Sequence, residues 1–324
     1  MILPARIALL LMVAGCGSPA PPGPSVATSP AGSPAQALTV EATIALEGLV
    51  DLAPSTDGVW YVRIDAAGGH VGLADRTGSV REVSTGPAPA AIAAGPDAIY
   101  VAEGPSATGD ASRTDRIEEL DPETLVVRAS TPLPVATDVV LDSGTVWAVS
   151  ADRGLIRATR DLSATVTTPL AGRGRARLAA GGGSVWVLNG RSDPASYLVH
   201  RIDPDNLTDV AIQLEGGGTF GAITAGADRV WVGTLGLAAG LGRIVEVQAD
   251  GSARNVAVVP AAADLIEDGG RLWWISVAGG VGWLDPDSAD LNGPVAVGSS
   301  GSCLAVSTGS MWACGDGLAI ITPG

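Results

Sequence analysis

Short apolar runs alternate with turn residues along the chain, and one nine-residue version of this pattern occurs seven times. Each copy consists of an apolar run, a turn with Gly, Asp or Ser, an apolar residue and then an aromatic residue. The aromatic residues are Trp60, Tyr100, Trp147, Trp186, Trp231, Trp273 and Trp312. A period of about 40 residues with several short strands per unit is typical of a β-propeller blade. The pattern therefore predicts an all-β fold, a seven-bladed β-propeller of four-stranded blades.

The strands of each unit can be assigned from the same pattern. The apolar run is strand a, the aromatic residue lies on strand b, and a later run such as residues 200–202 is strand c. An Asp-Pro turn often separates strand c from strand d, as at residues 121–122, 203–204 and 285–286. Asp and Pro suit such a turn because Asp bonds to nearby backbone and Pro presets φ. Calcium binding is the alternative explanation for these aspartates.

These turns resemble those of the YVTN, NHL and virginiamycin B lyase-like propeller repeats, and the resemblance covers residues 38–323. The resemblance implies the fold. For the lyase-like enzymes it also implies a His and a carboxylate around a magnesium ion on the channel face. His70 and His200 fall instead in strand c of blades 1 and 4, away from the expected channel. We therefore predict no metal, no cofactor and no catalytic residue.

The aromatic residues are expected to pack between blades. A two-residue a–b turn places Trp312 opposite Ala305, and the other aromatics face equivalent positions. Those positions are Ala53, Ala93, Val140, Ala179, Thr224 and Ile266. Most of them are small, which leaves room for a large ring. We favour core packing over a ligand cage.

The two ends of the repeat region complement each other. The last unit has a strand c at 317–322 and no strand d, whereas residues 38–46 read as a strand d without a blade of their own. Pairing the two would hide the open edges of the sheet. We therefore expect the N-terminal strand to complete the last blade.

Residues 1–15 have the charge, apolar run and small residues of a secretory signal peptide. The ending Val13-Ala14-Gly15-Cys16 resembles the bacterial lipobox, which implies that Cys16 carries acyl chains, palmitate among them. Residues 16–36 contain no charge and no aromatic, so we predict a disordered tether, followed by the propeller at 37–324. This predicts a lipoprotein anchored to the cell membrane on its extracytoplasmic side. Ordinary secretion is the alternative.

The charge of the chain limits its partners. The chain has 34 acidic residues and 19 basic residues, for a formal charge of −15. Every basic residue is an Arg. Such a chain repels nucleic acid, so its membrane contact is expected through the lipid alone. Three Cys and two His are too few for a zinc framework. In the last a–b hairpin Cys303 and Cys314 are directly opposed, which predicts a disulfide in an oxidising compartment. Two free thiols are the alternative.

One position at the start of strand a is expected near the mouth of the central channel. Its seven residues, called the axial position below, are Asp51, Ala91, Asp138, Arg177, Ala222, Asp264 and Cys303. The candidate binding rim, for a cation or a polar ligand, consists of Asp51, Arg63, Asp138, Arg177 and Asp264. Further residues are expected near the same rim: Glu103, Asp152, Arg153, Arg175 and Arg191. A solvated rim whose charges pair with one another is the alternative.

The functional prediction is a binding or scaffolding module for a cell-envelope protein or glycan, acting as a monomer. The sequence has no G-x-S-x-G nucleophile elbow and no dinucleotide-binding fingerprint on a strand–helix unit. The alternative is a metal-assisted lyase or hydrolase of the virginiamycin B lyase-like type. It would use the carboxylates of Asp51, Asp138 and Asp264 at the channel mouth.

Overall fold

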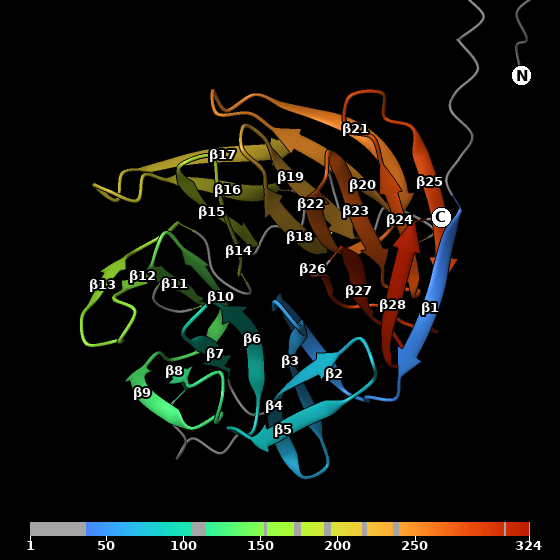
Figure 1. The fold of residues 1–324 in the computed structure, drawn as a ribbon. Helices are drawn as coiled ribbons and strands as arrows, with labels where there is room; N and C mark the ends of the chain where they lie inside the picture. Colours follow the sequence, from blue (N-terminus) through green and yellow to red (C-terminus); the bar gives the residue numbers. More distant parts are fainter. Residues whose placement is uncertain are drawn as a thin grey trace, which may run out of the picture. The chain divides into compact units, whose positions relative to one another are not determined.

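The protein is a seven-bladed β-propeller, seen here in a computed structural model. The structure describes residues 37–104, 115–151, 154–171, 176–190, 196–215, 219–235, 240–307 and 309–323. Seven antiparallel four-stranded sheets surround a common axis (Figure 1). Strand a of each blade contacts strand a of the next blade, and the last contact, between β26 and β2, completes the ring. The predicted fold class is confirmed.

The strands of the first four blades follow one another in sequence. They are β2 (Leu49–Pro54), β3 (Gly58–Asp65), β4 (Gly68–Asp75) and β5 (Val80–Ser84); β6 (Pro89–Ala94), β7 (Ile99–Glu103), β8 (Arg116–Leu120) and β9 (Val127–Pro132); β10 (Ala136–Asp142), β11 (Thr145–Ser150), β12 (Gly154–Ala158) and β13 (Thr165–Thr168); and β14 (Ala176–Gly181), β15 (Ser184–Gly190), β16 (Ser196–Ile202) and β17 (Asp209–Glu215). His70 and His200 lie on β4 and β16, the c strands where they were predicted.

Blades 5 to 7 continue the pattern, and blade 7 takes its fourth strand from the start of the region. These strands are β18 (Thr219–Ala225), β19 (Val230–Leu235), β20 (Leu241–Val247) and β21 (Ala253–Pro260); β22 (Ala262–Asp268), β23 (Arg271–Ser276), β24 (Gly280–Leu284) and β25 (Leu291–Ala296); and β26 (Leu304–Ser307), β27 (Ser310–Cys314), β28 (Leu318–Pro323) and β1 (Leu38–Ile44). β1 pairs with β28 from Leu38↔Pro323 to Ile44↔Leu318, so the blue and red ends of the chain lie side by side in Figure 1.

The seven aromatic residues are core residues, as predicted. Each is cross-strand from the expected partner, from Ala53↔Trp60 in blade 1 to Ala305↔Trp312 in blade 7. All seven are buried, and Trp231, Trp312 and Tyr100 are fully so. They pack with apolar residues of two neighbouring blades, so hydrophobic burial holds each blade to the next.

Cys303 and Cys314 form the predicted disulfide, with their Cα atoms 5.1 Å apart. The backbone N–H of Cys314 donates to the carbonyl of Cys303 at 2.9 Å, as expected for a hydrogen-bonded antiparallel pair. Ser307 faces Ser310 at the turn, which is the register that places the two cysteines opposite each other. The bridge joins strands a and b of blade 7 beside the axis.

The Asp-Pro turns are held by their own aspartates. Oδ1 of Asp121 accepts hydrogen bonds from two backbone N–H groups within the turn, and so do the equivalent atoms of Asp203 and Asp285. This is the side-chain to backbone bonding that the sequence predicts.

Arginines reach from one blade to the turn of the next. Arg81 donates to the carbonyls of Pro122 and Glu123, at the c–d turn of blade 2. In the same way Arg157 donates to Pro204 at 2.8 Å and Arg201 donates to Ala249 at 3.1 Å. The guanidinium fork suits this role because it carries five N–H donors in a fixed geometry. We call these contacts the turn-face arginine bonds.

None of the described segments contains a helix long and apolar enough to cross a membrane.

Candidate functional site

The axial position lies near the start of strand a in each blade, and in blade 7 its residue, Cys303, directly precedes β26. The strands differ just before this position. The register with strand b shifts before Asp51, Asp138 and Asp264. β14 instead pairs with β15 without a shift from Ala176 to Gly181. A bulge re-aims the side chain beside it. The local backbone therefore separates the aspartates from Arg177, although all four occupy equivalent positions.

The three aspartates bond to backbone, and each bond crosses to the next blade. Asp51 accepts from the N–H of Ile92 at 2.9 Å, Asp138 from Leu178 at 2.8 Å and Asp264 from Leu304 at 2.8 Å. The other oxygens of Asp138 and Asp264 accept from the N–H of the following residue. We call these contacts the aspartate clasps. They hold three of the seven junctions between blades.

Burial shifts the titration of these carboxyl groups. It raises the pKa of Asp51 to about 7, with the charge of Asp138 adding to the effect. Burial raises the pKa of Asp264 to about 6 and that of Asp138 above its ordinary value, while Arg177 acts in the opposite direction on both. Desolvation penalises the charged form of a buried acid, which accounts for the direction.

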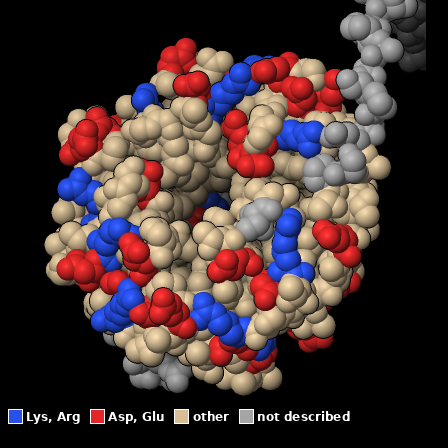
Figure 2. All heavy atoms as spheres, in the orientation of Figure 1, with Lys and Arg blue, Asp and Glu red and all other residues tan. Residues whose placement is uncertain are grey.

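Arg177 lines a cavity at the axis, and it makes no bond to the described residues of the next blade. The cavity has a volume of about 420 Å³. All seven blades contribute a wall residue directly before the axial position; these are Val50, Ala90, Thr137, Ala176, Gly221, Ala263 and Ser302. Leu49, Leu235 and Val277 add apolar surface. We call this the axial cavity. Figure 2 shows one face of the ring, which is hollowed at its middle and carries charged side chains around the hollow.

The guanidinium of Arg177 is without a partner among the described residues. They offer it neither a hydrogen bond nor an ion pair, and the carboxylates of Asp138, Asp51 and Asp264 act on it only through their charge. Burial works against the charged form of Arg177, but these carboxylates raise its pKa above the ordinary value. Arg177 is also the single charged residue among the described walls of the axial cavity.

Arg63 lies apart from the other members of the predicted rim. Its guanidinium forms a bidentate pair with Glu82 at 2.7 Å and contacts Asp65 at 2.7 Å. His70 lies between the same two carboxylates. These groups form a closed network within blade 1, and none of them lines the axial cavity.

The remaining sequence candidates near the rim divide into two groups. Glu103 is buried and accepts from the hydroxyl of Thr85 at 2.8 Å and the N–H of Gly86 at 3.0 Å, so it fixes the connection between blades 1 and 2. Asp152, Arg153, Arg175 and Arg191 lie outside the described residues, as does Cys16.

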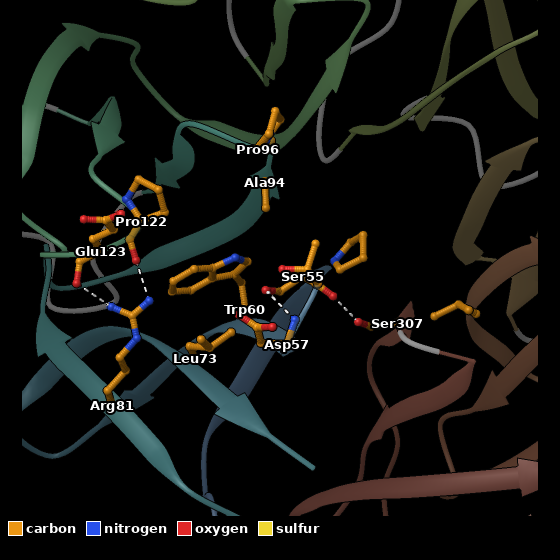
Figure 3. Close-up of a pocket in the computed structure, with 14 residues that line it drawn as sticks. Ser55, Asp57, Trp60, Leu73, Arg81, Ala94, Pro96, Pro122, Glu123 and Ser307 are labelled. Carbon is orange, nitrogen blue, oxygen red and sulfur yellow. Dashed lines mark hydrogen bonds between the residues drawn. The ribbon is translucent and has the colours of Figure 1, made fainter.

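A second, larger cavity of about 710 Å³ lies among the tight turns of blades 7, 1 and 2. Its arginine, Arg81, lies over the ring of Trp60 at 5.0 Å and is already bonded to Pro122 and Glu123 (Figure 3). Ser307 donates to the carbonyl of Ser55 across the same groove. Trp60 is only 5% exposed, which leaves too little ring surface for a ligand to stack on. Arg81 and Ser307, which face this cavity, are therefore both bonded to the protein itself.

The described residues contain no group of three or more His, Cys, Asp or Glu side chains arranged to hold a metal ion. His200 is fully buried, with Nδ1 3.0 Å from both oxygens of Asp209 and Nε2 3.0 Å from the carbonyl of Ala171. Its ring fixes the connection that leads into blade 4, since both nitrogens face protein oxygens.

Comparison with known proteins adds no family: no family model matches the chain, and no curated protein matches it significantly. The functional argument therefore rests on the geometry of the propeller alone.

Proposed function

We propose that the protein is a lipid-anchored, extracytoplasmic binding module for a cell-envelope protein or glycan, with the axial cavity as its ligand site. One observation carries this proposal: the guanidinium of Arg177, which has no bonding partner among the described residues, lines a cavity whose other described walls are mostly apolar. A charged group that is partly withdrawn from water and left without a partner is costly unless something binds it. The proposal gives Arg177 that partner.

A metal-assisted lyase or hydrolase is disfavoured by the bonds that the three aspartates make. Oxygens of Asp51, Asp138 and Asp264 are used to accept N–H groups of neighbouring blades. A catalytic metal needs several oxygen or nitrogen ligands directed at one point. The aspartate clasps direct theirs at separate junctions around the ring. The rim aspartates therefore support the fold, and of the two candidate functions we favour ligand binding over metal-assisted catalysis.

The anchor part of the proposal rests on the lipobox-like ending at Cys16. Several acyl chains on one terminus give stable membrane attachment, whereas a single chain gives only marginal binding. The Cys16→Ala variant of the full chain should therefore move from the membrane to the soluble fraction after cell disruption. A variant that sediments with membranes as completely as the parent would contradict the anchor.

The binding proposal can be tested with the full chain immobilised in detergent and exposed to solubilised envelope of the same cells. The matched control is Arg177→Met, which keeps the length of the side chain and removes its charge and donors. A partner that uses the axial cavity should be retained at least about tenfold less by the variant, or about 1.4 kcal/mol of lost affinity. Equal retention by the two proteins would contradict a ligand site at Arg177.

A further inference from the structure

The chemistry of the axial cavity narrows what can occupy it. This argument rests on the proposed function, because it asks which chemical group the proposed ligand site accepts. Arginine has five N–H donors and no acceptor, so the group that meets Arg177 must supply acceptor oxygens. The two hydroxyls of the wall are already engaged: Thr137 donates to the carbonyl of Ala176 at 3.1 Å, and Ser302 lies against the sulfur of Cys303 at 3.7 Å.

The remaining wall gives little polar recognition. The other described lining residues are all apolar: Leu49, Val50, Ala90, Ala176, Gly221, Leu235, Ala263, Val277 and Gly301. A ligand with many hydroxyl groups would leave them without partners there, at a cost for each one that is buried. A volume of about 420 Å³ lies within the range of small-molecule sites. The cavity therefore suits a short aliphatic body with its polar atoms at one end.

The surrounding charge limits the acceptor to a single negative charge. Asp138, Asp51 and Asp264 all act on Arg177 through their charge, and each of them repels anions in its ionised form. The coulombic repulsion between these carboxylates and a doubly charged phosphate is twice that for a monoanion at the same distance. A monoanion still forms a bidentate pair with the guanidinium. Carboxylate has the planar two-oxygen geometry that the guanidinium fork matches.

We infer that the axial cavity binds a carboxylate group carried on a short aliphatic body, with Arg177 as its bidentate partner. Two sources share this chemistry. One is a small free aliphatic acid, and the other is the C-terminal carboxylate of a protein chain that ends in small aliphatic residues. Both place the charge at Arg177 and the aliphatic part against the wall formed by Val50, Leu235 and Val277.

Calorimetric titration of the full chain in detergent tests the inference with five probes. Butanoate represents the free acid, and butanamide is its uncharged isostere. The tripeptide Ala-Ala-Val represents a chain end and is compared with its C-terminal amide. Inorganic phosphate represents a more highly charged anion. We expect saturable binding of butanoate or of the free tripeptide, and none of either amide or of phosphate.

Three variants make the result specific to Arg177. Arg177→Met should weaken carboxylate binding at least about tenfold, and Arg177→Lys should give an intermediate loss, because a lysine is a point charge without the planar fork. Arg157→Met removes a turn-face arginine and should leave binding unchanged. Tighter binding of butanoate would identify a free aliphatic acid as the ligand, and tighter binding of the tripeptide would identify the C-terminus of a protein chain.

Three results would overturn the inference. Binding of phosphate that depends on Arg177, without binding of either carboxylate, would leave a ligand site in the cavity but exclude the carboxylate class. Carboxylate binding of equal strength in wild type and Arg177→Met, or its absence up to about 10 mM, would exclude Arg177 as the partner. If carboxylate binding is equal in the two proteins or absent, the envelope capture decides independently whether the proposed binding function also fails.

Discussion

The two ends of the blades use the same side chain in opposite ways. At the tight turns Arg81, Arg157 and Arg201 each donate to backbone carbonyls of the next blade. Their guanidinium groups therefore have hydrogen-bond acceptors within the fold. At the axis the clasps are made by aspartates, and Arg177 bonds to nothing described in the structure. Arg177 therefore differs from the turn-face arginines in that its donors meet no acceptor among the described residues, and this difference supports the proposed ligand site.

Charged residues at equivalent positions around the axis also differ in what they contact. Asp138 and Arg177 occupy equivalent positions in adjacent blades, and the bulge before Asp138 is missing before Arg177. Asp138 accepts the N–H of Leu178, the residue directly after Arg177. The clasp thus fixes the backbone from which Arg177 extends, which preorganises the cavity wall.

The largest expected effect is on an aspartate clasp. Asp138→Ala leaves the N–H groups of Val139 and Leu178 buried without an acceptor, and we expect a loss of about 3 kcal/mol in the free energy of unfolding. Asp138→Asn keeps one acceptor oxygen and should lose less than half as much. Urea unfolding of the two variants measures the difference, and equal stability of Asp138→Ala and the parent would refute the clasp.

The next effect concerns Cys303, which occupies the axial position of blade 7. Replacing Cys303 and Cys314 together by Ala removes a short covalent loop, which we expect to cost about 2–3 kcal/mol of stability. Thiol counting on the denatured, unreduced parent should detect neither cysteine. Two free thiols would contradict the bridge.

A pH dependence should follow from Asp51. Its pKa is raised from 3.8 to about 7, so the folded chain holds a proton that the unfolded chain releases. The contribution to stability is therefore complete below about pH 4 and is lost as the pH rises through 7. Between pH 6 and pH 8 the loss should be on the order of 1 kcal/mol. Asp51→Asn keeps an acceptor for Ile92 and should flatten this part of the profile; an unchanged profile in that variant would assign the dependence elsewhere.

The smallest expected effects on stability come from replacing a turn-face arginine, Arg157, or the axial arginine, Arg177. Arg157→Met breaks a partly buried bond to Pro204 and should cost about 1 kcal/mol. Arg177→Met breaks no hydrogen bond to a described residue and should stay within about 0.5 kcal/mol of the parent in the absence of ligand. If thermal unfolding showed Arg177→Met to be the less stable of the two, Arg177 would have to be counted among the structural arginines.

The repeat made most of the fold predictable from sequence. The seven aromatic residues fix the register of strands a and b, and the same counting places Cys303 opposite Cys314. The equivalence of Asp51, Asp138, Arg177 and Asp264 could also be read from the repeat. Their different directions could not, because these follow from backbone shifts of one residue before each aspartate. The spacing of about 40 residues between Asp138 and Leu178 was the one available signal for a clasp between blades.

Two other features depend on contacts that a sequence pattern does not show. Leu125 and Leu207, at the fifth position of two Asp-Pro turns, adopt the left-handed conformation with φ of 58° and 62°. Gly is the usual residue there. Leu125 is 6% exposed and packs in the core of blades 1 and 2, so burial offsets the backbone cost. Arg63 likewise reads as a rim residue until the position of Glu82, 19 residues away, is known.

The most direct test of the central claim is the set of arginine Nε–H signals in a nitrogen–proton NMR spectrum, recorded while butanoate or, in a second titration, the tripeptide Ala-Ala-Val is added. The responses below refer to whichever of the two binds more tightly. Arg63 and Arg201 serve as internal controls, because their Nε–H groups donate to Glu82 at 2.7 Å and Ser184 at 3.1 Å. The account predicts that the Arg177 signal moves and saturates while the two controls stay in place. An Arg177 signal that does not respond, or shifts of the same size at Arg63 and Arg201, would contradict it.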